Sequence, residues 1–125
     1  MSYAFPREEV LNNLAKWIEI NLKHVIPNRI RVSILHPNVS ARSTLTVSFA
    51  SYPDNPLSDP AIYCILAKGI GYDYIRDIAE DLFWVRFFGD VTLYIPLPKK
   101  LKGKSEIMDR FIKERYPHEF EQVDI

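Results

Sequence analysis

Two pairs of short segments with alternating apolar side chains constrain the fold of this chain most strongly. The clearer pair is residues 84–88 and 91–95, which are separated by Gly89-Asp90. A two-residue link that begins with glycine is typical of a β-hairpin with a type II′ turn. Residues 29–35 and 44–49 form the second pair, joined by a longer segment rich in turn-forming residues. The patterns predict two antiparallel hairpins in one sheet.

Three further segments carry apolar residues at helical spacing. In residues 6–25 one stripe holds Leu11, Leu14, Ile18, Leu22 and Val25. Residues 72–82 place apolar and charged side chains on opposite faces, and about residues 105–116 form a third such helix that ends before Pro117. These segments predict helices that cover the sheet.

Residues 61–67, Ala-Ile-Tyr-Cys-Ile-Leu-Ala, fit two structures. Ser58-Asp59-Pro60 before them and Gly69 after them would cap a short helix. The segment is short and rich in Ile and Tyr, however, which favours a third strand. With that strand the chain is an α+β single domain over residues 1–116, followed by a C-terminal tail at 117–125. The expected order is α-βββ-α-ββ-α, with a mainly antiparallel sheet and the helices packed on one face.

The formal net charge is zero, from sixteen basic and sixteen acidic residues, but the charges are placed unevenly. Residues 29–52 hold three bases and no acid, and residues 84–104 hold five bases and one acid. Residues 53–83 hold two bases and six acids. The two predicted hairpins are therefore basic, so a neutral sum does not exclude binding to a polyanion.

A binding face follows if the alternating apolar side chains of the sheet face the helices. The opposite face then carries Arg31, Trp84, Arg86 and Tyr94. Arginine forks and aromatic rings suit protein contacts and also single-stranded nucleic acid. Further phosphate contacts would come from Arg29, Arg42, Lys99, Lys100, Lys102 and Lys104. A solvated sheet face, or one packed in a dimer, explains the same pattern.

The sequence offers no recognisable catalytic constellation. His24, His36 and His118 are separate and form no metal-binding or catalytic pattern. Asp73, Asp77 and Asp81 line one helical face without a partner carboxylate motif, which is typical of a solvated face. The single cysteine, Cys64, excludes an internal disulfide and a cysteine-based zinc site, and we expect its thiol to be buried. We therefore expect no catalytic residue, no metal and no cofactor.

The predicted order of elements resembles the secretion-chaperone-like fold, whose small α+β domains often dimerise and bind partner proteins. Fourteen isoleucines, seven tyrosines, nine prolines and a single glutamine give a composition similar to small proteins of hyperthermophilic archaea and their viruses. With no apolar run of 18 residues and no secretory signal, we expect a cytoplasmic protein (in the host cytoplasm or virion if viral) with no membrane contact.

Together these patterns predict a non-enzymatic protein-interaction module that forms a homodimer or binds another protein. The alternative is a nucleic-acid-binding protein that uses the basic and aromatic sheet face and the segment 99–104.

Overall fold

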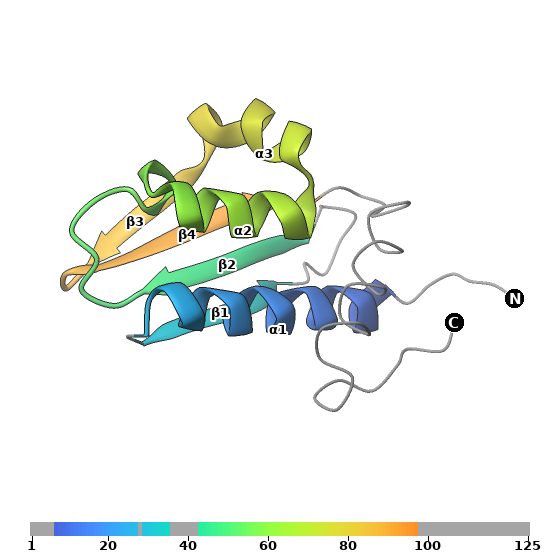
Figure 1. Cartoon of the computed structure of the whole chain (residues 1–125), viewed down its shortest axis with the longest axis horizontal. Coiled ribbons are helices and arrows are strands. Elements are labelled where there is room, and N and C mark those ends of the chain that lie inside the picture. The colour runs from blue at the N-terminus through green and yellow to red at the C-terminus, as the bar shows by residue number, and fades with distance from the viewer. Residues whose placement is uncertain (1–6, 28, 36–42, 98–125) are drawn as a thin grey trace, which may run out of the picture.

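The computed structural model describes residues 7–27, 29–35 and 43–97, which fold into helices and one antiparallel sheet (Figure 1). Helix α1 (Arg7–Val25) is followed by β1 (Ile30–Leu35) and β2 (Thr44–Phe49), then by α2 (Pro60–Ile70) and α3 (Tyr72–Ile78), and finally by β3 (Phe83–Phe87) and β4 (Asp90–Pro96). Short 3-10 helices lie at Pro56–Ser58 and Ala79–Asp81. The predicted α+β class is confirmed.

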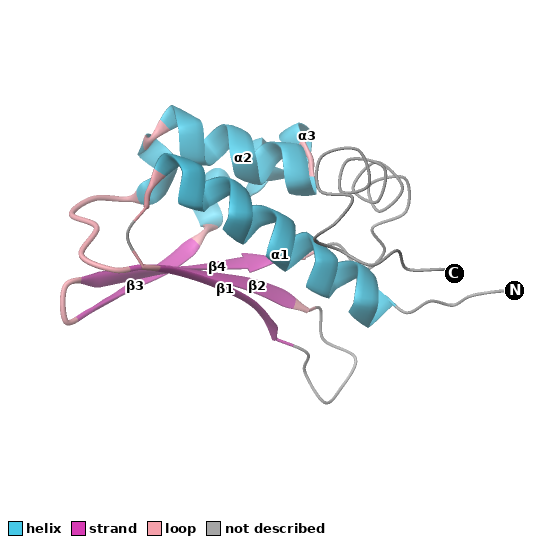
Figure 2. Ribbon diagram, turned by 60° about the horizontal axis from the view of Figure 1, so that its bottom comes forward, coloured by secondary structure: helices cyan, strands magenta, loops and turns pink. Residues whose placement is uncertain are grey.

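The sheet has four strands in the order β1-β2-β4-β3, and all neighbours are antiparallel. The described helices form a second layer over one face of this sheet, as Figure 2 shows. Helix α1 packs against β1 and α2, and α2 packs against α3. No described element covers the other face, which we call the open face. In the two central strands it carries Thr46, Ser48, Thr92 and Tyr94.

The core lies between the sheet and the helices. Leu45 and Val47 of β2 lie opposite Ile95 and Leu93 of β4, and all four side chains are fully buried. The stripe predicted for the first helix is confirmed at Leu14, Ile18 and Leu22, which are also buried, but Val25 at the end of the helix is exposed. Each such side chain contributes about 1.5–3 kcal/mol on burial.

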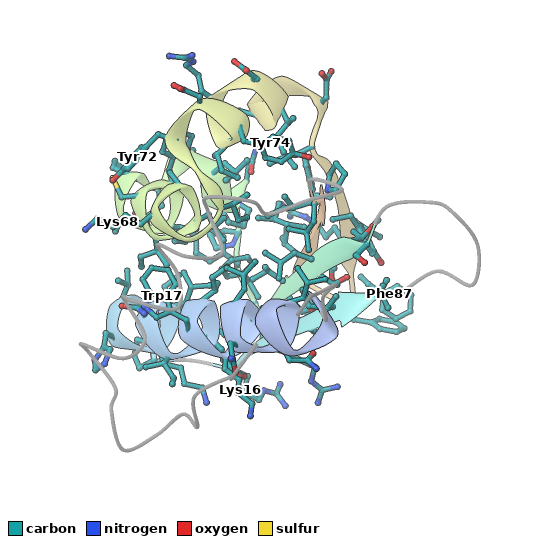
Figure 3. All side chains as sticks on the ribbon, turned by 90° about the vertical axis from the view of Figure 1, so that its right-hand side faces the viewer. Lys16, Trp17, Lys68, Tyr72, Tyr74 and Phe87 are labelled. Atoms are coloured by element: carbon teal, nitrogen blue, oxygen red, sulfur yellow. The ribbon has the colours of Figure 1, made fainter. Side chains whose placement is uncertain are left out.

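The two longer helices approach each other closely around Trp17, which lies between them (Figure 3). A Cβ atom on Gly69 of α2 would lie 3.0 Å from the Trp17 ring and 3.3 Å from Ile18 and Leu14. Glycine therefore lets α2 pack directly against the indole. This contact fixes the spacing of the helix layer and explains why glycine stands at position 69.

The strand expected at residues 61–67 is wrong, because this segment lies inside α2. Asp59 caps the helix by accepting a hydrogen bond from the Ala61 N–H at 2.9 Å, and Pro60 occupies the first turn. Ile62, Leu66 and Ile70 share one buried face at helical spacing. Capping and packing thus outweigh the strand preference of isoleucine and tyrosine.

The helix at 60–70 has two consequences for the sequence predictions. The described elements run α-ββ-α-α-ββ, so the first half lacks the third strand on which the secretion-chaperone-like order depended. Cys64 also turns outward on α2 and is exposed, which contradicts the expected buried thiol. The helix predicted at 72–82 is confirmed as α3, with its last turn in 3-10 form. The helix predicted at 105–116 lies outside the described residues.

Candidate interaction surface

The β3–β4 hairpin turns at Phe88-Gly89, one residue earlier than the predicted Gly89-Asp90 link. Phe87 lies directly opposite Asp90, and φ is positive at both Phe88 (51°) and Gly89 (85°). Two positive φ angles define a type I′ turn, which matches the twist of the flanking strands. Glycine adopts this conformation readily, whereas a bulky residue at position 88 is strained.

The register of β3 places its side chains on faces that differ from the expected ones. Trp84 lies opposite Leu93 and Arg86 lies opposite Val91, both of which point into the core. Because opposite residues in an antiparallel pair share a face, Trp84 and Arg86 lie on the helix side. The expectation that they share a face with Arg31 and Tyr94 is therefore wrong.

Alternation alone does not show which face of β3 points toward the helices, because β3 has apolar residues at both odd-numbered and even-numbered positions. Val85 and Phe87 were expected to face the helices because they are apolar, yet the tight turn pairs Val85 with Thr92 on the open face. A two-residue turn at 88–89 and one at 89–90 both place Trp84 and Arg86 opposite core residues of β4. The length of the turn therefore indicates which face of β3 points toward the helices.

Four large apolar side chains of the hairpin are exposed, and we call them together the hairpin surface: Trp84 on the helix side, Val85 and Phe87 on the open face, and Phe88 in the turn. Their exposed fractions are 44%, 48%, 64% and 92%. The rings of Phe87 and Phe88 meet edge to face with centroids 4.2 Å apart. Figure 3 shows Phe87 on the side of the sheet away from Trp17. Exposed aromatic residues gathered in this way are typical of an interaction site.

The loop that follows β2 fixes the position of the hairpin. The Arg86 guanidinium donates a hydrogen bond to the Pro53 carbonyl, and the Asp90 carboxylate accepts one from the Ser51 N–H at 2.9 Å. In the same loop Tyr52 packs against Phe49 and donates to Asp59 at 3.3 Å. These contacts hold the hairpin in one orientation.

The outer edge of β3 carries no strand among the described elements, and β3 has extensive contacts only with β4. An unpaired edge presents backbone N–H and C=O groups that can pair with another chain. Natural proteins protect such edges with lysines, prolines, bulges or a covering helix. Strand β3 contains none of these residues, and its one charged side chain is Arg86.

At the opposite edge of the sheet lies an open polar groove of about 710 Å³. Its basic lining residues are Lys23, Arg29 and Arg31, and its acidic ones are Glu19 and Asp90. Two of the residues predicted to contact phosphate, Arg29 and Arg31, therefore lie together in this groove.

The remaining predicted binding residues divide into two groups. Tyr94 lies on the open face, in register with Thr46 and on the same face as Arg31. The others lie outside the described residues: Arg42, Lys99, Lys100, Lys102 and Lys104. The residues of the predicted binding face are thus split between the two faces of the sheet, with Arg31 and Tyr94 on the open face and Trp84 and Arg86 on the helix side.

The described residues show no arrangement suited to catalysis. None of their polar or charged side chains is buried, and none of their His, Cys, Asp and Glu side chains forms a cluster able to hold a metal ion. His24 is exposed at the end of α1. The acidic face of α3 is neutralised in part by Arg76, which lies 3.3 Å from Asp73 and 3.6 Å from Asp77.

No known protein family, curated protein or solved structure matches this chain. The resemblance in composition therefore stays a prediction, and the described elements lack the third strand that the resemblance in element order requires. Within the residues that the structure describes, no helix has the length and apolar character needed to cross a membrane.

Proposed function

We propose that this protein is a non-enzymatic protein-interaction module that forms homodimers through the hairpin surface. The observation that carries the proposal is the exposure of Trp84, Val85, Phe87 and Phe88 beside an unpaired strand edge. Burying apolar surface contributes about 25 cal/mol per Å², so these side chains are the strongest local source of association energy. Aromatic residues and arginine are also the types enriched in protein interfaces.

The strained backbone at Phe88 supports the same proposal. Asparagine or glycine would suit a positive φ at the first turn position far better than phenylalanine does. The large ring instead projects almost fully into solvent at the tip of the hairpin. A residue that is unfavourable for the fold and also exposed is explained by a role in contact with a partner.

Sedimentation analysis of the full chain over a range of concentrations tests the proposal. We expect a monomer–dimer equilibrium, and we expect the double substitution Phe87→Ser/Phe88→Ser to weaken the dimer by about tenfold or more. Leu35→Ser is the control, because Leu35 is a half-exposed apolar residue on β1 at the other edge. A chain that stays monomeric at every concentration, or equal weakening by Leu35→Ser, contradicts the proposal.

The polar groove favours a second candidate function, the binding of nucleic acid. Lys23, Arg29 and Arg31 line this groove. Strands β1 and β2, which follow Lys23 in the chain, contain no acidic residue. We expect binding of a fluorescent oligonucleotide at low salt to weaken strongly in Arg29→Ala/Arg31→Ala. Arg86→Ala serves as the control, because Arg86 lies at the opposite edge of the sheet. Absence of binding at low salt rejects this candidate.

A further inference from the structure

We infer that the partner of β3 is β3 of a second copy, paired antiparallel about a two-fold axis that passes through Val85. The inference rests on the proposed homodimer and specifies how its two chains meet. It joins the two sheets edge to edge into one sheet, with four strands from each copy. Three observations carry it: the direction of the backbone groups on β3, the self-complementary sequence of the strand, and the lack of lysine, proline or a bulge in β3.

The backbone geometry follows from the tight turn. Phe87 and Asp90 flank the two-residue turn, so their backbone groups bond to each other across the hairpin. Hydrogen-bonded and non-hydrogen-bonded pairs alternate along an antiparallel ladder. Val85 therefore bonds inward to β4, while the N–H and C=O groups of Trp84 and Arg86 point outward to the unpaired edge.

A two-fold axis at Val85 uses all of these outward groups. In that register Trp84 of one copy lies opposite Arg86 of the other, and the relation is repeated by symmetry. Each of the two pairs is of the hydrogen-bonded type, because both of its members have outward groups. Val85 then faces Val85 of the second copy in a non-hydrogen-bonded pair, where side chains approach most closely.

The side chains are complementary in the same register. An arginine beside an indole ring gains a cation–π attraction, and the dimer contains this pair twice. The Arg86 guanidinium is already held by the Pro53 carbonyl, which leaves its planar faces available for stacking. A two-fold axis at Arg86 would instead set two arginines against each other, and like charges directly opposite are destabilising.

Long-range charge does not oppose this contact, because the formal net charge of each copy is zero. One short strand from each copy makes a small interface, however. We therefore expect a reversible dimer with a dissociation constant of about 1 μM or weaker rather than an obligate one.

Disulfide trapping tests the register in the full chain. The exposed Cys64 is first replaced, giving Cys64→Ala, and Val85→Cys is added. The Cα atoms of a non-hydrogen-bonded antiparallel pair lie about 4.5 Å apart, which a disulfide can bridge. We expect mild oxidation to convert this variant into a covalent dimer. The matched control is Ser33→Cys in the same background, at the middle of β1 on the other edge, and it should stay uncrosslinked.

A second variant, Phe87→Cys in the Cys64→Ala background, checks the register itself. In the inferred dimer the two cysteines lie four residues apart along the strands, about 13 Å, and cannot bond. Crosslinking of this variant in preference to Val85→Cys would overturn the inferred register. A sedimenting dimer in which Val85→Cys does not crosslink would overturn the edge pairing but leave the proposed homodimer intact. A strictly monomeric wild-type chain would overturn both.

Discussion

The two edges of the sheet differ in how far they are protected against pairing with another chain. Strand β1 packs against α1, which buries the side chain of Ile30, and its open face carries Arg31. Arg29 stands beside it, so two copies of this edge would bring four arginines together. Strand β3 has extensive contacts only with β4 among the described elements, and its described side chains are all exposed.

On this contrast we base the proposal that the sheet associates through β3 rather than through β1. Charge and a covering helix are devices that prevent edge-to-edge pairing, and β1 has both. Strand β3 has no covering helix among the described elements, and its one charged side chain, Arg86, is bonded to the Pro53 carbonyl in the loop at 51–53. A rigid, apolar and uncovered strand loses little conformational entropy when a partner binds.

The largest effect should come from giving β3 the kind of charge that protects β1. Val85→Lys places two ammonium groups opposite each other at the two-fold axis, and we expect the dimer to weaken by about 100-fold. Sedimentation measures the change. Because Val85 is half exposed, the monomer should keep its fold. Ser33→Lys makes the same change at the middle of β1 and should leave the dimer unchanged, whereas equal loss in both variants would break the contrast between the edges.

A smaller effect is expected in the covered half of the molecule, where packing rather than association is at stake. Gly69→Ala forces the Trp17 ring, itself buried, to move. Overpacking of this kind costs about 1–3 kcal/mol, and the better helix propensity of alanine returns about 1 kcal/mol. Chemical denaturation should show a net loss of up to about 2 kcal/mol. Lys68→Ala, at the exposed neighbouring position, should change the stability by less than about 0.5 kcal/mol.

The turn of the hairpin should show opposite effects on stability and on association. Phe88→Asn gives the Asn-Gly pair that a type I′ turn prefers, so the free energy of unfolding should rise by about 1 kcal/mol. The same substitution removes the most exposed ring of the hairpin surface, so the dimer should weaken. Denaturation of dilute protein and sedimentation measure the two changes separately. A variant that is stabilised and still dimerises as tightly would show that Phe88 lies outside the interface.

The smallest effect concerns pH. Partial burial, and then the charge of Asp59, raise the pKa of Tyr52 above its usual value of 10.0. The folded state therefore favours the neutral phenol, and this stabilisation is complete below about pH 10 and is lost as the pH rises further. Tyr52→Phe should flatten the decline in stability above about pH 10. Denaturation curves of the wild-type chain and of Tyr52→Phe, recorded at pH 8 and above about pH 10, test this expectation. An equally steep decline in both would contradict it.

Much of the fold was predictable because local patterns and packing agreed. The stripe of the first helix and the alternation of β1, β2 and β4 each have one apolar face that packs toward the core, although Val25 is exposed and Val32 and Ile34 are only partly buried. Residues 61–67 misled because isoleucine and tyrosine favour strands while the Asp59 cap favours a helix. The deciding contact, of α2 with Trp17, joins positions far apart in the chain.

The candidate site was predicted less well, for a different reason. Trp84 and Arg86 were predicted to share a face with Arg31 and Tyr94, but they lie on the helix side, whereas the apolar residues Val85 and Phe87 lie on the open face. An edge strand without a covering helix does not turn its apolar residues to the core by rule, since neither face is fully buried. Only the turn register distinguishes its two faces.

Amide hydrogen exchange measured by NMR at low and high protein concentration tests the central claim most directly. The amides of Trp84 and Arg86 point to the unpaired edge of β3, so they should exchange fast in dilute protein and become protected as the concentration rises. The Val85 amide, bonded to β4, should be protected throughout. At the other edge, the Arg29–Ala50 hydrogen bond implies that the Val32 amide points outward, and its exchange should not depend on concentration. Concentration-independent exchange at Trp84 and Arg86 would contradict the account.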